Sequence, residues 1–148
     1  MPSEHQIEIF RQHRVAQEKY VYFLLAAAGA AIAFAVTQTQ GAKLGWLQIP
    51  LAMAVFLWAL SFYFGCKQLA CALSTLFANS GLLQVESGEH PDVGTHPQLM
   101  TAASRGIRDA IETHSSRAIL FGQWQFRALI LGSAFYLGWH VLEMWHRT

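Results

Sequence analysis

The sequence predicts an all-α integral membrane protein with three transmembrane helices, its N-terminus in the cytoplasm and its C-terminus outside. Hydrophobic residues make up 53% of the 148-residue chain and charged residues only 13%, whereas an average soluble domain carries roughly 25% charged residues. Three apolar runs occupy residues 20–37, 49–66 and 128–145. A helix of about 18 residues rises about 27 Å, close to the thickness of the hydrocarbon core of a bilayer.

The first predicted element is a cytoplasmic helix over residues 3–19, which leads without a break into the first span. Ser3 and Gln6 fit a capping box, which satisfies the free N–H groups of a first helical turn. This segment is polar and has no apolar core, so we expect no cleavable signal peptide and targeting through the first span itself.

The middle of the first span consists of small residues at a spacing that favours helix packing in lipid. The helix-packing candidates are Ala26, Gly29, Ala30 and Ala33, which form the pairs Ala26/Ala30 and Gly29/Ala33. Small residues three to four positions apart let helix backbones approach closely. The pattern does not decide whether the partner is another span or another copy of the chain.

An outer loop is predicted over residues 38–48, followed by the second span over 49–66. Pro50 suits the first turn of a helix, where its missing N–H does least harm. Apolar residues continue at helical spacing beyond Lys67, so we expect the helix to run on to about residue 79, with Asn79-Ser80-Gly81 as its stop.

Residues 80–117 predict a cytoplasmic loop and then an amphipathic helix that begins near Pro97. The third span follows at 128–145, with Arg127 able to extend its side chain to the headgroups. A single apolar stripe marks the amphipathic helix, made of Leu99, Ala103, Ile107, Ala110, Ile111 and His114.

Basic residues set the expected orientation. Eight of the ten Lys and Arg residues lie on one side of the three spans, and only Lys43 and Arg147 lie on the other. Basic residues stay on the cytoplasmic side of a membrane. We therefore expect the N-terminus and residues 80–117 inside and the C-terminus outside. The small size of the chain and the absence of eukaryotic targeting signals favour the bacterial inner membrane as the location.

Three charged or polar residues of the third span are candidates for a pore or gate: Arg127, His140 and Glu143. His140 and Glu143 share a helical face, and ionisable groups within a membrane are often functional. The alternative is that both are interfacial residues that bind headgroups or water. For Thr37, Ser61, Gln123 and Gln125 we expect hydrogen bonds between helices.

The candidates for cytoplasmic interaction are Arg105, Arg108, Glu112 and His114, with Arg108 and Glu112 expected to form an i,i+4 pair. The Arg108/His114 spacing resembles the Arg/His signature of the HEPN ribonucleases, which would imply a nuclease acting at a helical dimer interface. The loop residues Glu89, His90, Asp92 and His96 could hold a metal, but a solvated loop explains them as well. We expect no metal and no cofactor.

The layout of the chain resembles small multi-span membrane effectors and accessory proteins of bacterial anti-phage systems, some of them CRISPR-associated. That resemblance implies a homo-oligomer that perturbs the membrane on a cytoplasmic signal. The sequence shows no catalytic triad, phosphate loop or basic run for nucleic acid. We expect a non-enzymatic pore-forming or membrane-perturbing effector whose partners are the lipid bilayer, other copies of the chain and a cytoplasmic protein. The alternatives are an adaptor subunit acting through residues 81–117, a small transporter subunit or the HEPN-like nuclease.

Overall fold

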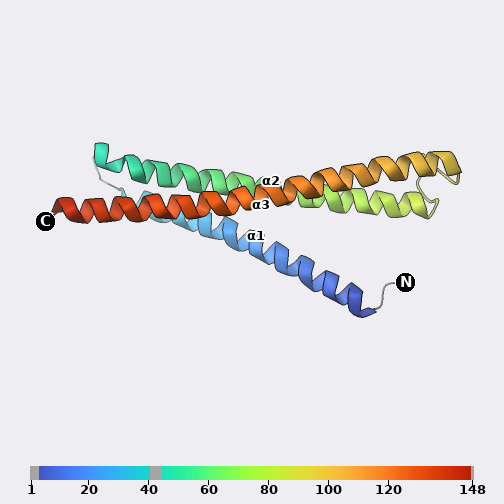
Figure 1. Ribbon diagram of the computed structural model, residues 1–148, viewed down its shortest axis with the longest axis horizontal. Helices are drawn as coiled ribbons and strands as arrows, with labels where there is room; N and C mark the ends of the chain where they lie inside the picture. The colour runs from blue at the N-terminus through green and yellow to red at the C-terminus, as the bar shows by residue number, and fades with distance from the viewer. Residues whose placement is uncertain (1–3, 41–44, 148) are drawn as a thin grey trace. The chain divides into compact units, whose positions relative to one another are not determined.

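The computed structural model describes the backbone of residues 4–40 and 45–147. All the regular secondary structure in this part of the chain is helical. The elements are α1 (Glu4–Gln38), the short 3-10 helix η1 (Trp46–Gln48), α2 (Ile49–Glu86) and α3 (Pro97–Arg147) (Figure 1). The all-helical class is as predicted. The predicted capping residue Ser3 lies outside the described residues, and so does Lys43 of the outer loop.

The chain folds as two compact units that share α2 and α3. Met1–Gly65 and Gln123–Thr148 form the three-helix unit, which holds α1 and one part each of α2 and α3. Cys66–Gly122 forms the hairpin unit, made of the remaining parts of α2 and α3. Each unit has its own packing.

The three-helix unit closes around one seam of buried residues from each helix. A three-to-four-residue spacing recurs on all three helices, as expected for helices that pack at a shallow angle. The buried members are Val21, Leu24, Ala28 and Ala35 of α1, Leu51, Ala54, Trp58, Ser61 and Gly65 of α2, and Gln125, Ala128, Gly132 and Trp139 of α3. Aromatic contacts add to this seam, with Tyr136 between Trp58 and Trp139 at ring-centroid distances of 5.6 Å to each.

Close approach of α2 and α3 in this unit depends on Gly132. A Cβ atom added there would lie 2.7 Å from both Cδ1 and Nε1 of Trp58 and 3.1 Å from the carbonyl oxygen of Ala54. The indole ring therefore occupies the space that any other side chain would need. The glycine is required by packing, because its backbone lies in an ordinary helical conformation.

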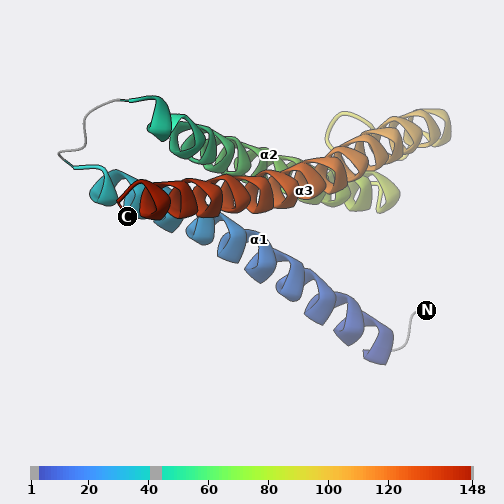
Figure 2. The ribbon, with the colours of Figure 1, turned by 60° about the vertical axis from the view of Figure 1, so that its left-hand side comes forward.

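The hairpin unit is an antiparallel pair of helical segments with its own heptad seam. On α3 the half-buried residues include Met100, Ser104, Ile107, Ile111, His114 and Ala118, and on α2 they include Gln68, Cys71, Thr75, Ala78 and Leu82, with Val85 fully buried. Figures 1 and 2 show the two segments side by side, joined by the loop at residues 87–96. The apolar stripe predicted for residues 99–114 faces this seam from Ala103 to His114, whereas Leu99 is exposed.

Two predicted boundaries differ from the structure. Helix α2 continues through Asn79-Ser80-Gly81 to Glu86, because Leu82 and Val85 extend its packing seam by two more turns. It ends in a Schellman motif, in which Glu89 N donates to Gln84 O at 3.0 Å and Gly88 N donates to Val85 O at 3.2 Å. Gly88 has a φ of 74°, the left-handed conformation that glycine adopts at no steric cost.

Helix α3 is the other difference. The amphipathic helix and the third span, predicted as separate segments, form a single helix of 51 residues that begins at Pro97 as expected. Helix α1 is unbroken across the predicted junction at residues 19 and 20.

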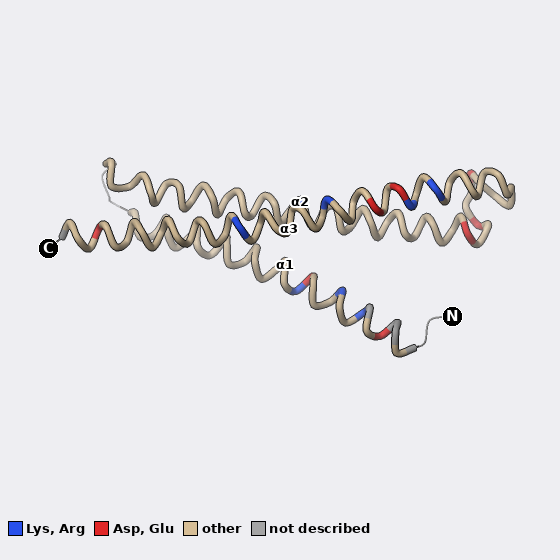
Figure 3. The backbone as a smooth tube through the Cα atoms, viewed as in Figure 1, with Lys and Arg blue, Asp and Glu red and all other residues tan. Residues whose placement is uncertain are grey.

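Two helical segments of the described chain are long and apolar enough to cross a membrane, Arg11–Gln38 and Trp46–Glu86. They contain the first two predicted spans. The third predicted span, 128–145, is not among them, because His140 and Glu143 lower its apolar character. Among the residues that the structure describes, charge gathers on the first parts of α1 and α3, while α2 carries almost none (Figure 3).

Candidate functional site

The predicted pore or gate residues do not share one face of α3. At about 100° per residue, His140 lies roughly 140° and Glu143 roughly 160° around the helix from Arg127. Arg127 is exposed, and its guanidinium lies over the Trp124 ring, 5.5 Å from the centroid. His140 is exposed beside Glu143, which is half-buried. A water-filled conduit needs polar groups aligned along one face, and these three do not provide it.

The predicted helix-packing residues of α1 are not used inside the chain. Ala26, Ala30 and Ala33 are exposed, and a Cβ atom on Gly29 would meet nothing within 4 Å. The buried face of α1 holds Ala28 and Ala35 instead. Packing of the first group against another copy stays a prediction.

The interior of the three-helix unit contains two fully buried polar side chains, Ser61 and Gln125. Ser61 Oγ donates to the carbonyl oxygen of Gln125 at 2.8 Å, which is one of the predicted hydrogen bonds between helices. Within the part of the chain that the structure describes, the side-chain amide of Gln125 has no hydrogen-bond partner at either Oε1 or Nε2. It packs against Gly65, where an added Cβ would lie 2.5 Å from Nε2 and 2.6 Å from Leu25 Cδ2.

A buried amide without partners destabilises a fold, since its removal from water costs about 1–3 kcal/mol in protein mutational data. Gln125 therefore places a polar amide group inside the mostly apolar core of the three-helix unit. Thr37 contributes nothing of this kind, because its hydroxyl donates to Phe34 O of the same helix at 2.8 Å.

Charged residues gather along α3 in the hairpin unit (Figure 3), and Arg105, Arg108, Asp109 and Glu112 are exposed there. Arg108 Nη2 donates to Glu86 Oε1 of α2 at 2.9 Å, so the ion pair that the structure shows for Arg108 differs from the predicted pair with Glu112. A shallow groove of about 480 Å³ runs beside this ion pair, lined by Glu86, Met100, Thr101, Ser104, Arg105 and Arg108. Arg105 and Glu112 are exposed on the same helix.

Arg108 and His114 do not converge. They are six residues apart on α3, which places them roughly 120° apart around the helix. Arg108 is exposed and paired with Glu86. His114 is half-buried in the hairpin seam, and its buried Nδ1 has no hydrogen-bond partner among the described residues. One copy of the chain therefore does not place these two side chains together as a nuclease would need.

The loop after α2 is folded by its own backbone. His90 O accepts hydrogen bonds from Val93 N and Gly94 N, and His90 Nδ1 accepts one from Asp92 N at 3.3 Å. No group of three or more His, Cys, Asp or Glu side chains that could hold a metal ion occurs among the residues described. The four loop residues considered as ligands, which include Glu89 and His96, are thus not gathered into a site.

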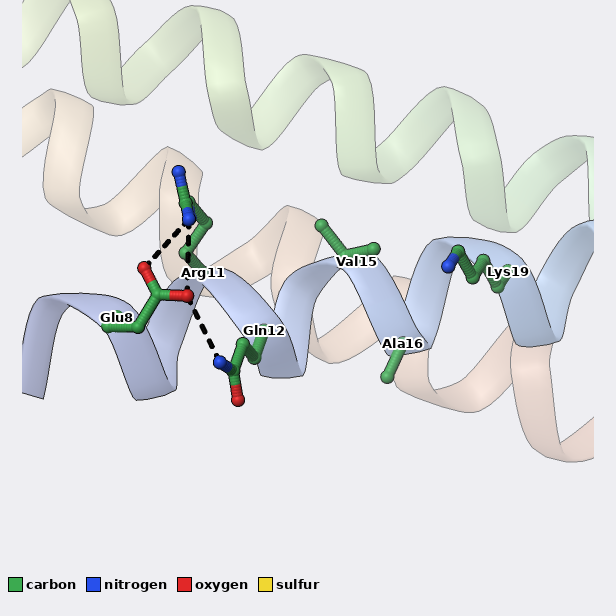
Figure 4. Close-up of a pocket in the computed structure, with 6 residues that line it drawn as sticks. All are labelled: Glu8, Arg11, Gln12, Val15, Ala16 and Lys19. Carbon is green, nitrogen blue, oxygen red and sulfur yellow. Dashed lines mark hydrogen bonds and ion pairs between the residues drawn. The ribbon is translucent and has the colours of Figure 1, made fainter.

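A second groove, of about 440 Å³, lies along the first part of α1 (Figure 4). Its residues are Glu8, Arg11, Gln12, Val15, Ala16 and Lys19. Glu8 accepts a hydrogen bond from Gln12 Nε2 at 3.0 Å and forms an ion pair with Arg11 Nη2 at 2.9 Å. The hydrogen bond from Gln12, and then those from Arg11, lower the pKa of the Glu8 carboxyl. These contacts stay within one helix and describe a solvated helical face.

Two features of this architecture were missed by sequence reasoning. Gln68 packs its amide against Gly122, where an added Cβ atom would lie 2.9 Å from Nε2. Its Oε1 is buried and has no hydrogen-bond partner among the residues that the structure describes. Glu86 was not recognised as the partner of Arg108. The available signal was the heptad spacing of Gln68 with the apolar residues of α2, which continues to Val85.

Comparisons with other proteins add no functional assignment: no protein-family model, no curated protein and no solved structure matches the chain.

Proposed function

We propose that this protein is a non-enzymatic membrane adaptor, in which a three-span anchor presents the hairpin unit to a protein partner on the cytoplasmic side. The observation that carries the proposal is the charged outward face of α3 within a separately packed hairpin. That face combines Arg105, Arg108 and Glu112 with the groove next to Glu86. Charged groups of both signs on a rigid helix suit recognition of a complementary protein surface.

The proposed anchor comprises spans at 20–37, 49–66 and 128–145. Support for the third span comes from the outward face of α3, where large apolar side chains stay exposed. Ile130, Leu131, Leu137 and Val141 are each more than half exposed, and Phe23 and Phe56 are comparably exposed on the other two helices. A three-helix unit that is apolar on its outside as well as its inside suits lipid.

The proposed orientation places the N-terminus and the hairpin unit in the cytoplasm. It follows from the unequal distribution of basic residues, since Arg105, Arg108 and Arg117 in the hairpin join Arg11 and Arg14 of α1 on one side. Cysteine accessibility tests this directly. A water-soluble maleimide applied from outside should label a cysteine placed at His146 but not one placed at Thr113.

A homomeric pore or membrane-perturbing effector is the second proposal. One observation favours it: His140 and Glu143 lie on neighbouring positions of one helical face, with His140 exposed. The arrangement of Arg127 away from that face weighs against it. The adaptor is placed first for this reason.

Site-specific photocrosslinking in living cells tests the adaptor. A photoreactive residue at Glu112 should capture one defined protein, and the double variant Arg105→Glu/Arg108→Glu should abolish that product. The matched control is Arg14→Glu on the exposed face of α1, which should leave the product unchanged.

Conductance of the purified protein in planar bilayers tests the pore. The adaptor proposal expects no channel activity. Channel openings that disappear in the variant His140→Ala/Glu143→Ala, with no photocrosslinked partner at Glu112, would overturn the adaptor and favour the pore.

A further inference from the structure

We propose that residues 66–86 of α2 form a parallel two-stranded coiled coil with the same segment of a second copy of this chain, with Cys66 at the interface. This goes beyond the adaptor function, because it concerns the face of the hairpin opposite to α3. It uses the proposed membrane orientation only to set the two copies parallel.

The outward face of α2 in the hairpin unit has a regular heptad of its own. Leu69, Leu76 and Leu83 are spaced seven residues apart, and Cys66, Leu73 and Ser80 form a second series at the same spacing. The two series alternate at intervals of three and four residues, which is the a/d pattern of a coiled coil. With Cys66 at an a position, the leucines at 69, 76 and 83 fall at d.

This second seam lies on the opposite side of the helix from the first. The residues that face α3, such as Cys71, Ala78 and Val85, fall at f positions, roughly 180° from the midpoint between a and d. Five of the six a/d residues are exposed in the chain and Leu69 is half-buried. Leu73 is 60%, Leu76 38% and Leu83 62% exposed, and Phe77, at a flanking e position, is 83% exposed.

The occupant that fits this face is a helix with the same period. Lipid requires an apolar surface but no repeat, whereas a strict period of 3.5 residues is what keeps a seam facing another helix. Ser80 interrupts the seam with a hydroxyl, which suits contact with a polar atom of a facing helix better than contact with acyl chains. Charge is absent between Lys67 and Glu86, at the two ends of the segment.

A second copy in parallel orientation satisfies the remaining constraints. Leucine occupies all three d positions, and an identical segment supplies an identical seam in a two-fold interface. The flanking e and g positions create no like-charge conflict along the pair. They hold Ala70, Phe77 and Gln84 at e, and Ala72, Asn79 and Glu86 at g.

The native cysteines provide the test. Facing a positions of a parallel pair approach closely enough for a disulfide, which needs Cα atoms about 4.4–6.8 Å apart. Cys66 is exposed and free, whereas Cys71 is half-buried on the seam toward α3. Native membranes are treated with copper phenanthroline and dioxygen, which accept the two electrons and two protons that a pair of thiols releases.

The expected result is a covalent dimer in the wild type and in Cys71→Ser, and its loss in Cys66→Ser. A variant with Leu73→Cys in a background lacking both native cysteines should restore the dimer, because position 73 is the next a position. Failure of both Cys66 and Leu73→Cys to form a dimer overturns the proposal, whether or not the thiols react with maleimide. A reactive thiol would then mean an open face, and an unreactive one a face covered by lipid or another protein.

A second measurement does not depend on thiol chemistry. Native mass spectrometry from nanodiscs should show dimers for the wild type and monomers for Leu76→Lys, since this change places a charge at the middle d position. The matched control is Thr113→Lys on the exposed face of α3, which should remain dimeric. A Leu76→Lys protein that stays dimeric refutes the proposed interface. If the photoreactive residue at Glu112 captures no protein in the wild-type chain while the dimers stay intact, the adaptor proposal alone is refuted.

Discussion

Replacement of Gly132 by alanine tests whether Trp58 fixes the spacing of α2 and α3. The new methyl group would lie 2.7 Å from two ring atoms of Trp58, well inside ordinary contact at 3.4–4 Å, and 3.1 Å from a backbone oxygen. Trp58 is only 4% exposed, so it has little space to move. Overpacking of this kind costs about 1–3 kcal/mol. Better helix propensity returns about 0.5–1 kcal/mol of that, which leaves a net destabilisation of about 0–2.5 kcal/mol.

Gly138→Ala is the matched control on the same helix, because a Cβ there meets nothing within 4 Å. Gly138→Ala should gain only the stability that comes from the better helix propensity of alanine. The free energies of unfolding of the two variants should therefore differ by the overpacking cost, about 1–3 kcal/mol. Reversible unfolding by SDS in mixed micelles, followed by tryptophan fluorescence, measures the difference. Equal stability of Gly132→Ala and Gly138→Ala would refute the packing of Trp58 on Gly132.

Three further predictions concern polar groups. Gln125→Leu should leave stability unchanged or raise it, because it removes a buried amide that has no partner; a loss of more than about 1 kcal/mol in the same unfolding assay would show that the amide is satisfied. The Arg108–Glu86 ion pair is exposed, so a double-mutant cycle should give a coupling of about 0.2–1 kcal/mol that decreases with added salt. The lowered pKa of Glu8 means that its contribution to the first turns of α1 is present above the unfolded pKa and is lost as pH falls through the folded pKa. Gln12→Ala should raise the pKa of Glu8 toward its ordinary value in an NMR titration, and no change would contradict the hydrogen bond as its main cause.

Local sequence signals predicted the start of α3 correctly but placed the end of α2 too early. Pro97 marks the start of α3, where a proline suits the first helical turn. Asn79-Ser80-Gly81 resembles an end as strongly as Ser87-Gly88 does, yet the helix ends at the second site. The difference is packing: Leu82 and Val85 bury apolar surface against α3, and this outweighs the weak helix propensity of Gly81.

The candidate residues were only partly predictable for a related reason. Spacing shows which residues of one helix share a face, so it identified the stripe from Ala103 to His114 that packs in the hairpin. It does not show which face meets which helix. The small-residue spacing at Ala26 and Ala30 left open whether the partner is another span or another copy, and within the chain the buried residues of α1 include Ala28 and Ala35.

The sequence by itself determined the helical class, the two long apolar segments of α1 and α2, and the separation of charged from apolar regions, because these follow from composition and period along one helix. Only the tertiary structure decided that Gln125 is buried, that Gly132 receives Trp58 and that Glu86 pairs with Arg108. These contacts join residues 22 to 74 positions apart. They depend on the register between helices, which is set by the shapes of many side chains fitting together and not by any one segment.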